Sequence, residues 1–318
     1  MKINLKSILN KWIKVLARLY LPVYKYESET MKIAFAGYSS IKRSYCARLL
    51  LGKESNHTSA GYRFFWAMPK MLKSCDVVVS EISPLAYNKF QKYNGFIMPV
   101  WATMRINIDR PLSEITKITV SDFSNVMRRI RKYNLSYEIL NDKESFDLFY
   151  NRFYLPYTSV RHGEEALIED LSVFWNSLSS RSIMAVKEDN MIVAAALISR
   201  AGDSFNFMRL GLLDGNEEYR KHGVIGALYY FGIVEGQKTG YKYFDVGGTR
   251  PFLSDGLTKY KMGLCAEFVQ DHSFWKEYLW FGFKKDSAAA QDFLNANPFM
   301  HIDGQNRLVR YEVNEGIK

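Results

Sequence analysis

Apolar runs separated by turn residues predict the strands of the second half of the chain. Three such runs, at 182–187, 191–199 and 205–213, are joined by short polar turns. A long helical pattern at 216–238 follows, and a short apolar run at 241–246 predicts one more strand. A meander followed by a long helix and another strand predicts a mixed sheet flanked by helices.

Strands and helices also alternate in the first part of the chain. The runs at 32–37 and 76–82 predict strands, those at 45–51 and 84–93 predict helices, and 96–108 predicts an extended segment. This order indicates an α/β layer. Neither GxGxxG nor GxxxxGK[ST] occurs, so dinucleotide and P-loop sites are rejected.

The segment before this layer combines helical spacing of apolar residues with positive charge. Apolar positions recur from Leu5 to Tyr20, Pro22 is expected to end the helix, and no acidic residue precedes Glu27. Basic residues interrupt the apolar run, so a spanning helix is not expected, and a signal-peptide cleavage site is absent. Two alternatives stay open: residues 1–21 lie in an anionic membrane surface, or the helix docks on the protein's own body.

Composition points to anionic partners and a reducing environment. The 318 residues carry a formal net charge of +10, which attracts nucleic acid, acidic lipids or phosphorylated donors. Three widely separated cysteines, Cys46, Cys75 and Cys265, indicate a cytoplasmic setting, with peripheral attachment to the inner face of the membrane as an extension of the same prediction. The five histidines lack metal-ligand spacing, so no metal site is predicted.

Two residues of the first part are candidates for substrate binding. Glu81 ends the apolar strand at 76–82, where a carboxylate acts as an acid, a base or an anchor. The alternative is a carboxylate exposed at the sheet edge. Trp101 follows Pro99 in the extended segment.

Cations gather in the middle of the chain. The helix at 123–132 carries four of them near its carboxyl end, which complements the helix dipole or, alternatively, forms a phosphate-binding face. An aromatic helix is expected to end at Pro156, before Tyr157 and the step Arg161-His162. That step places a fixed cation beside a titratable imidazole, whereas the alternative is a helix cap followed by a turn.

The stretch after the run at 241–246 concentrates the candidate chemistry. Gly247 and Gly248 let the backbone turn and approach a ligand closely. Charged residues then follow in quick succession, namely Arg250, Asp255, Lys259 and Lys261. This pattern predicts a site for an anionic or carbonyl-bearing ligand, and the alternative is an Asp-Gly turn followed by a solvated basic face.

The run from Asp245 to Gly263 resembles the closing segment of the Fem-like branch of the GNAT-fold acyltransferases, with its Arg-Pro-Phe, Asp-Gly and Lys-Tyr-Lys pattern. YLPYTSVRHGEEA and MPVWATMRINIDRP resemble other segments of the same group. The resemblance implies an α/β protein with two GNAT-like halves, the second with a mixed central sheet flanked by helices. Its parts would be an N-terminal helix at 1–30, a reduced half at 31–118 and an acyltransferase domain at 119–318.

The resemblance also implies direct transfer of an acyl or aminoacyl group from acyl-CoA or aminoacyl-tRNA to an amine or hydroxyl of an envelope or lipid-linked acceptor. No permanently bound cofactor is expected. An amine is mostly protonated at neutral pH, so a base must take its proton, and hydrogen-bond donors must stabilise the oxyanion. The alternatives are a non-catalytic, membrane-associated binding protein of this fold and a small-molecule N-acetyltransferase that uses acetyl-CoA.

The residue patterns and the resemblance together give individual residues candidate roles. The catalytic candidates are Asp245, Asp255 and Lys259. The substrate-binding candidates are Arg161, His162, Tyr157, Arg250, Lys261, Trp101 and Glu81. The donor-binding candidates are Arg220, Gly223, Gly226, Gly247 and Gly248.

One departure concerns the donor. The segment 220–226 occupies the position of the GNAT pyrophosphate loop, usually R/Q-x-x-G-x-G/A, and Arg220 and Gly223 fit that pattern. Ile225 does not fit, and the second glycine comes one residue late. A side chain where the backbone must approach phosphate obstructs acyl-CoA, whereas an aminoacyl-tRNA donor is compatible with the change.

Overall fold

The chain divides into two compact units, each built from segments that are distant in the sequence. The computed structural model describes residues 5–52, 56–118, 122–162, 181–271 and 276–311. Unit 1 comprises Met1–Ala102, Arg250–Thr258 and Gln270–Lys318, and unit 2 comprises Thr103–Thr249 and Lys259–Val269. The division of the chain at residues 30 and 118 stays a prediction of the sequence, in which local pattern gives no signal for the return of the chain to unit 1.

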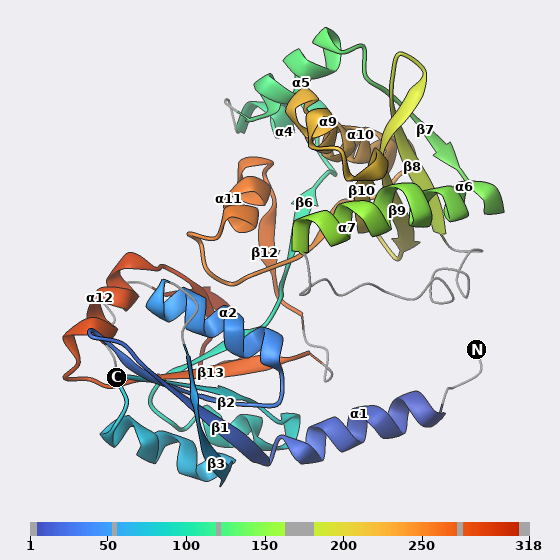
Figure 1. The fold of residues 1–318 in the computed structure, drawn as a ribbon. Helices are drawn as coiled ribbons and strands as arrows, with labels where there is room; N and C mark the ends of the chain where they lie inside the picture. Colours follow the sequence, from blue (N-terminus) through green and yellow to red (C-terminus); the bar gives the residue numbers. More distant parts are fainter. Residues whose placement is uncertain (1–4, 53–55, 119–121, 163–180, 272–275, 312–318) are drawn as a thin grey trace. The chain divides into compact units, whose positions relative to one another are not determined.

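Unit 1 is a mixed eight-stranded sheet with the order β15-β14-β5-β13-β4-β2-β1-β3 (Figure 1). Its strands are β1 (Tyr20–Glu27), β2 (Lys32–Ala36), β3 (Thr58–Phe64), β4 (Val77–Glu81), β5 (Phe96–Pro99), β13 (Tyr278–Phe283), β14 (Met300–Ile302) and β15 (Leu308–Arg310). Its helices are α1 (Leu5–Ala17), α2 (Ser40–Leu51), η1 (Phe65–Lys73), η2 (Pro84–Ala86), α3 (Tyr87–Phe90) and α12 (Ala288–Ala296).

Alternate residues of the central strands of unit 1 enter two different cores. In β2, Ile33 and Phe35 pack with α2 residues, whereas Ala34 and Ala36 pack on the opposite face with residues of η1 and α3. The same alternation continues in β4 and β13. Both faces of the sheet are therefore buried, which explains the uninterrupted apolar runs in the sequence.

The amino-terminal helix is shorter than predicted, and a strand follows it. Helix α1 ends at Ala17, and Pro22 lies inside β1 rather than at the end of the helix. A break in the β1–β3 register falls between Pro22 and Tyr24. Proline lacks an N–H group and is tolerated in strands at such irregularities. The prediction that Pro22 ends the helix is therefore wrong.

Unit 2 is a mixed seven-stranded sheet with the order β12-β6-β11-β10-β9-β8-β7. Its strands are β6 (Ala102–Asn107), β7 (Ser136–Leu140), β8 (Arg181–Glu188), β9 (Met191–Ala201), β10 (Ser204–Leu212), β11 (Tyr243–Thr249) and β12 (Glu267–Val269). Its helical segments are α4 (Leu112–Ile118), α5 (Asp122–Lys132), α6 (Lys143–Leu148), the π-helical η3 (Phe149–Tyr154), α7 (Leu155–His162), η6 (Leu213–Gly215), α9 (Glu217–His222) and α10 (Val224–Lys238). Helix α11 (Gly256–Gly263) spans the division between the units.

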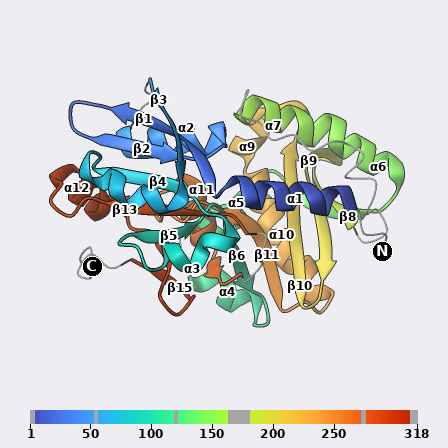
Figure 2. The ribbon, with the colours of Figure 1, turned by 90° about the horizontal axis from the view of Figure 1, so that it is seen from below.

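Helices cover both faces of the β8–β10 meander (Figures 1 and 2). Ile183 and Leu197 pack with η3 on one face, whereas Met184 and Ile198 pack with α10 on the other. The predicted meander is confirmed, and so are the predicted α/β class and the mixed central sheet flanked by helices, and unit 1 adds a second mixed sheet. Within the described residues, no helix combines the length and the apolar character needed to cross a membrane.

Two helix boundaries of unit 2 differ from the prediction. The helix expected at 216–238 is broken at Gly223, where φ is +87°, into α9 and α10. Pro156 does not end a helix, because α6, η3 and α7 follow one another without a gap and Pro156 lies just after the π-helical η3.

The packing of η3 on β10 predicts a large effect of a small substitution. A Cβ atom at Gly211 would lie 2.2 Å from the backbone oxygen of Phe153, which cannot move without displacing η3. We expect Gly211→Ala to lower the free energy of unfolding by about 3 kcal/mol in chemical denaturation. Gly304→Ala is the control, because a Cβ atom there meets nothing within 4 Å. Equal stability of the two variants would contradict this packing.

Candidate functional site

Strands β10 and β11 of unit 2 pair over only a short stretch. Their parallel register runs from Ser204 opposite Tyr243 to Asn206 opposite Asp245. Beyond this point β10 continues to Leu212 and β11 to Thr249, with no further pairing between the described residues of the two strands. β10 also bulges toward this end, because its register with β9 shifts between Phe207 and Arg209. The pairing between two central neighbours in one sheet thus ends just before Gly247 and Gly248.

A buried lysine holds the glycine segment of β11. Lys261 is only 3% exposed. Its ammonium donates hydrogen bonds to the carbonyl of Gly247 at 3.1 Å and to the carbonyl of Gly248 at 2.9 Å. Gly247 has φ of +76°, a conformation that other residues rarely adopt. Contrary to the prediction, β11 does not stop before the two glycines but includes them. Lys261 therefore fixes backbone that would otherwise be free to change its path.

Asp245 acts on the same segment from within β11. Its Oδ1 accepts a hydrogen bond of 2.8 Å from the N–H of Gly247, and its Oδ2 lies 3.2 Å from Nε of Arg105. Two donors thus fix the orientation of the carboxylate. Arg105, on β6, was not among the predicted site residues.

The junction of α9 and α10 is where the predicted pyrophosphate loop lies. A Cβ atom at Gly223 would lie 2.5 Å from Cδ of Arg129 on α5, and one at Gly226 would lie 2.6 Å from Cγ2 of Val126. Both glycines therefore let α5 approach α10 closely. Ile225 packs against the core of unit 2, and Arg220 forms an exposed ion pair of 2.9 Å with Glu217. The cation beside the start of α10 is Arg129, which the motif did not identify.

Arg250 of unit 1 is enclosed by aromatic rings. Its guanidinium lies 3.9 Å from the ring centroid of Tyr45 and 4.1 Å from that of Trp101, and it donates to the carbonyl of Val100 at 3.2 Å. Burial lowers the pKa of Arg250 from its ordinary value. Cation–π contacts of this kind stabilise a partly desolvated cation. The sequence predicted Arg250 and Trp101 separately, and the structure places them in contact.

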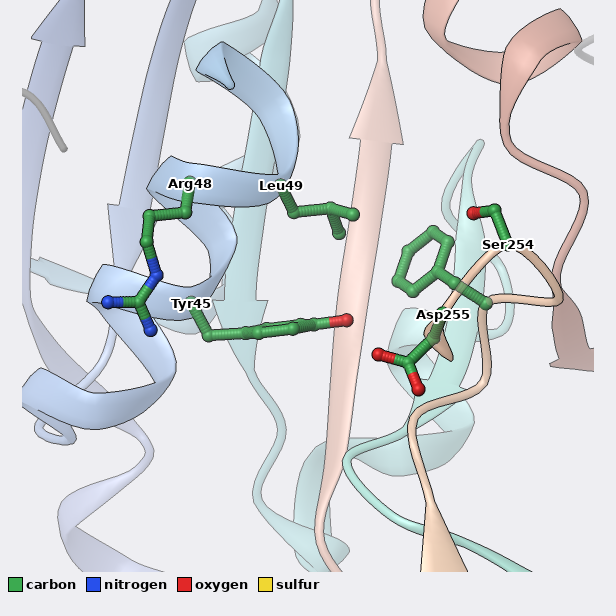
Figure 3. A pocket seen from close by; sticks show the side chains of 6 residues that line it. Tyr45, Arg48, Leu49, Ser254 and Asp255 are labelled. Carbon is green, nitrogen blue, oxygen red and sulfur yellow. The ribbon is translucent and has the colours of Figure 1, made fainter. Parts of the chain in front are cut away.

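A pocket of about 310 Å³ opens beside Tyr45 in unit 1 (Figure 3). Its lining residues are Tyr45, Arg48, Leu49, Phe252, Ser254 and Asp255. The Tyr45 hydroxyl and the Asp255 carboxylate point toward one another across it (Figure 3). Burial raises the pKa of Tyr45, which keeps the phenol neutral and able to donate a hydrogen bond.

Asp255 is primarily the cap of α11. Its Oδ1 accepts hydrogen bonds of 3.0 Å from the N–H groups of Leu257 and Thr258. Its Oδ2 receives no hydrogen bond from the described residues, and the cationic Arg48 lines the same pocket. Among the described residues, no group of three His, Cys, Asp or Glu side chains is placed to hold a metal ion.

Glu81 lies in a buried ionic cluster, and the expectation of an exposed sheet-edge carboxylate is wrong. β4 lies between β13 and β2, and Glu81 is 2% exposed. Its carboxylate lies 3.2 Å from Nζ of Lys42 and 3.6 Å from Nε of Arg18, and both cations also contact Glu277. A Cβ atom at Gly37 would lie 2.7 Å from Cγ of Glu81, so only glycine leaves room for this side chain.

The remaining predicted residues are dispersed over unit 2. Tyr157 is buried in the core, and its hydroxyl accepts a hydrogen bond from Arg161. Lys259 is exposed on α11. The side chain of His162, and all of Gly163, lie outside the described residues.

The partners that sequence reasoning missed are Arg18, Lys42, Tyr45, Arg48 and Arg105. Lys42, Tyr45 and Leu49 recur at helical spacing, but the pattern of α2 does not show which of its faces meets a ligand. Their partners on β4 and after β11 are distant in sequence, so local spacing contains no signal for them.

Comparison with known proteins gives distant structural matches alone. No known protein family and no curated protein matches the sequence. FemX is similar in structure over 85% of this chain and 90% of its own, with 12% identity and a TM-score of 0.46. A C-terminal domain of a putative lysylphosphatidylglycerol synthetase from Agrobacterium fabrum covers 86% of this chain and 85% of its own, at 11% identity and a TM-score of 0.39. A GCN5-related N-acetyltransferase from Sphaerobacter thermophilus covers 82% and 76%, at 11% identity and a TM-score of 0.37.

These solved structures include the Fem-like and GCN5-related kinds of protein that the sequence resembles. Likeness at this level concerns the fold alone. What the protein does must be argued from the residues of its own two units.

The ionic cluster predicts a pH dependence of stability. Burial opposes ionisation of Glu277, but Lys42 and Arg18 outweigh it and hold the pKa below the ordinary 4.5. A lowered pKa in the folded state stabilises the fold above the unfolded pKa, and this contribution is lost as the pH falls through the folded pKa. Glu277→Gln should therefore be less stable than the unaltered protein above about pH 4.5, and the difference should shrink below it.

Thermal unfolding across a pH series measures this difference. Glu29→Gln serves as the control, because Glu29 is an exposed carboxylate of the same unit. A deficit that stays constant down to pH 2 would show that ionisation of Glu277 is not its source.

Proposed function

We propose that the protein is an acyltransferase whose unit 2 receives the activated carbonyl of an acyl donor between β10 and β11. The observation that carries this proposal is the end of their pairing at Asn206 and Asp245. Backbone N–H and C=O groups that lose a strand partner must find another hydrogen-bond partner. The extended arm of a donor, with its own carbonyl, supplies such a partner.

The glycine segment favours this use of the gap. Gly247 and Gly248 present backbone without side chains, and Lys261 holds their carbonyls in place. A pre-set backbone segment lowers the cost of reorganisation when charge develops on the reacting carbonyl. Lys261 is thus a positioning residue in this proposal rather than a group that contacts the donor.

The carrier of the acyl group is anionic in either donor class. The first turn of α10 offers N–H groups at the positive end of its dipole, and the guanidinium-bearing side chain of Arg129 lies against Gly223 at that turn. The segment 220–226 lacks the glycine spacing of the usual phosphate-binding loop, and on this ground we propose aminoacyl-tRNA in preference to acyl-CoA. The net charge of +10 suits either polyanion.

The reaction is a direct transfer. The acceptor nitrogen or oxygen attacks the carbonyl carbon, a C–N or C–O bond forms, and the ester or thioester bond to the carrier breaks. The proton of the acceptor leaves, and the departing ribose hydroxyl or thiol gains one. An envelope or lipid-linked amine is the proposed acceptor, and Asp245 orients β11 beside the reacting carbonyl.

A second candidate is a binding protein that has lost catalysis. This candidate is favoured because predicted acids and cations already have partners within the protein. Asp245 accepts two hydrogen bonds, Asp255 caps α11, and Arg220 pairs with Glu217. In that case the pocket beside Tyr45 binds a cationic group through Asp255 and no transfer occurs.

Incubation of the full chain with a panel of donors separates the two candidates. Aminoacyl-tRNAs and acyl-CoA thioesters are supplied with a water-soluble amine, and mass spectrometry detects the acylated amine. We expect product from aminoacyl-tRNA in preference to acyl-CoA. We expect Lys261→Met to lower kcat by about 100-fold, because a shift of about 1 Å in the glycine segment misplaces the carbonyl.

Lys242→Met is the matched control, since Lys242 is exposed just before β11. Its rate should equal that of the unaltered protein, and thermal unfolding shows whether each variant is folded. Donor binding without product from any donor would favour the binding protein, and neither binding nor product would contradict a donor site in unit 2.

A further inference from the structure

Helix α1 exposes an apolar face. Leu9, Trp12, Ile13 and Leu16 recur at the spacing of one helical face, and they are 41–61% exposed. The helix docks on unit 1 near its carboxyl end, where Val15 is buried and its carbonyl accepts a hydrogen bond of 2.7 Å from Ser83. An amphipathic helix normally buries its apolar face, whereas these four apolar residues of α1 are exposed.

An exposed aromatic cluster adjoins the end of α1. Tyr20 stacks on Tyr62 at 5.4 Å and lies 4.6 Å from Phe64, which stacks on Trp66 at 4.4 Å. The four rings belong to residues that are 45–51% exposed. β3 is the edge strand of the sheet, and most of its residues are exposed on both of its faces. We call the apolar face of α1 and these four aromatic residues together the anchor surface.

The chain segments that form the anchor surface are basic. Residues 1–26 and 55–75, which contain the whole surface, include nine lysines and arginines and no aspartate or glutamate. Exposed cations among them are Lys11, Lys14, Arg63, Lys70 and Lys73. Arg18 is the exception, because it belongs to the buried cluster with Glu81.

We propose that the anchor surface binds the interface of a lipid bilayer that contains anionic lipids. Tyrosine and tryptophan favour the boundary between headgroups and acyl chains, where the ring is apolar and its polar atom stays hydrated. Lysine and arginine beside them attract anionic headgroups. A protein partner would have to match eight residues from four elements, whereas a bilayer requires only exposed apolar groups and cations. The inference is independent of acyl transfer, because it uses no residue of unit 2.

Flotation of the full chain with lipid vesicles tests this proposal. Vesicles of phosphatidylcholine are compared with vesicles that also contain phosphatidylglycerol, and we expect binding to the second kind that weakens as salt is added. The triple variant Leu9→Ser/Ile13→Ser/Phe64→Ser should bind about tenfold or more weakly, because it removes apolar groups that enter the interface.

The matched control is Leu148→Ser/Val160→Ser/Met191→Ser, which removes three exposed apolar side chains of unit 2. It should bind as the unaltered protein does. Lys11→Glu/Lys14→Glu should weaken binding to anionic vesicles, and Lys89→Glu/Lys285→Glu, with the same change in charge, should weaken it much less.

Either of two outcomes would overturn the proposal. Equal binding of the Leu9/Ile13/Phe64 variant and its control would show that the anchor surface is not in the interface. A variant that changes only the oligomeric state in analytical ultracentrifugation would assign the surface to a second copy of the chain. Transfer to a water-soluble amine should stay unchanged in the anchor variants, so a failure here is distinguishable from a failure of the proposed activity.

Discussion

The contact between the buried Lys261 ammonium and the carbonyls of Gly247 and Gly248 is the constraint on which the site of unit 2 depends. A cation removed from water must have hydrogen-bond acceptors, so α11 and the end of β11 are tied together. Asp245 adds a second tie, because it accepts the N–H of Gly247. With both ties in place, β11 leaves β10 along one defined path instead of fraying. The end of the β10–β11 pairing is thus followed by backbone that these contacts hold in place, and the proposed donor site depends on it.

The charged residues after β11 make structural contacts and are at the same time candidates for ligand binding. Asp255 caps a helix with one oxygen and faces the pocket beside Tyr45 with the other. Arg250 is stacked between Tyr45 and Trp101, so its charge is shielded and its position is rigid. Such groups are poor candidates for proton transfer and good candidates for holding backbone or ligand in place. The proposed transfer therefore relies more on positioning by the backbone than on a strong base.

The sequence predicted those parts of the fold in which local pattern and packing agree. The β8–β10 meander has alternating burial and clear turns, so its strands were correctly predicted. β1 was missed because Pro22 is typical of a helix end, and α11 was missed because its eight residues begin and end with glycine. The break at Gly223 serves the close approach of α5, which local spacing does not show. Lys42, Tyr45 and Arg105 were missed for the same reason, since each meets a partner distant in the chain.

The central claim is that a reactive carbonyl lies between β10 and β11 beyond Asn206 and Asp245. A crystal structure of the full chain with a non-reactive analogue of an aminoacyl-tRNA terminus, in which an amide replaces the ester, tests it most directly. The account predicts that the amide carbonyl of the analogue lies in that gap and is hydrogen-bonded to the backbone of β10 or β11. An analogue bound only in the pocket beside Tyr45, with the two strands unoccupied between them, would contradict it.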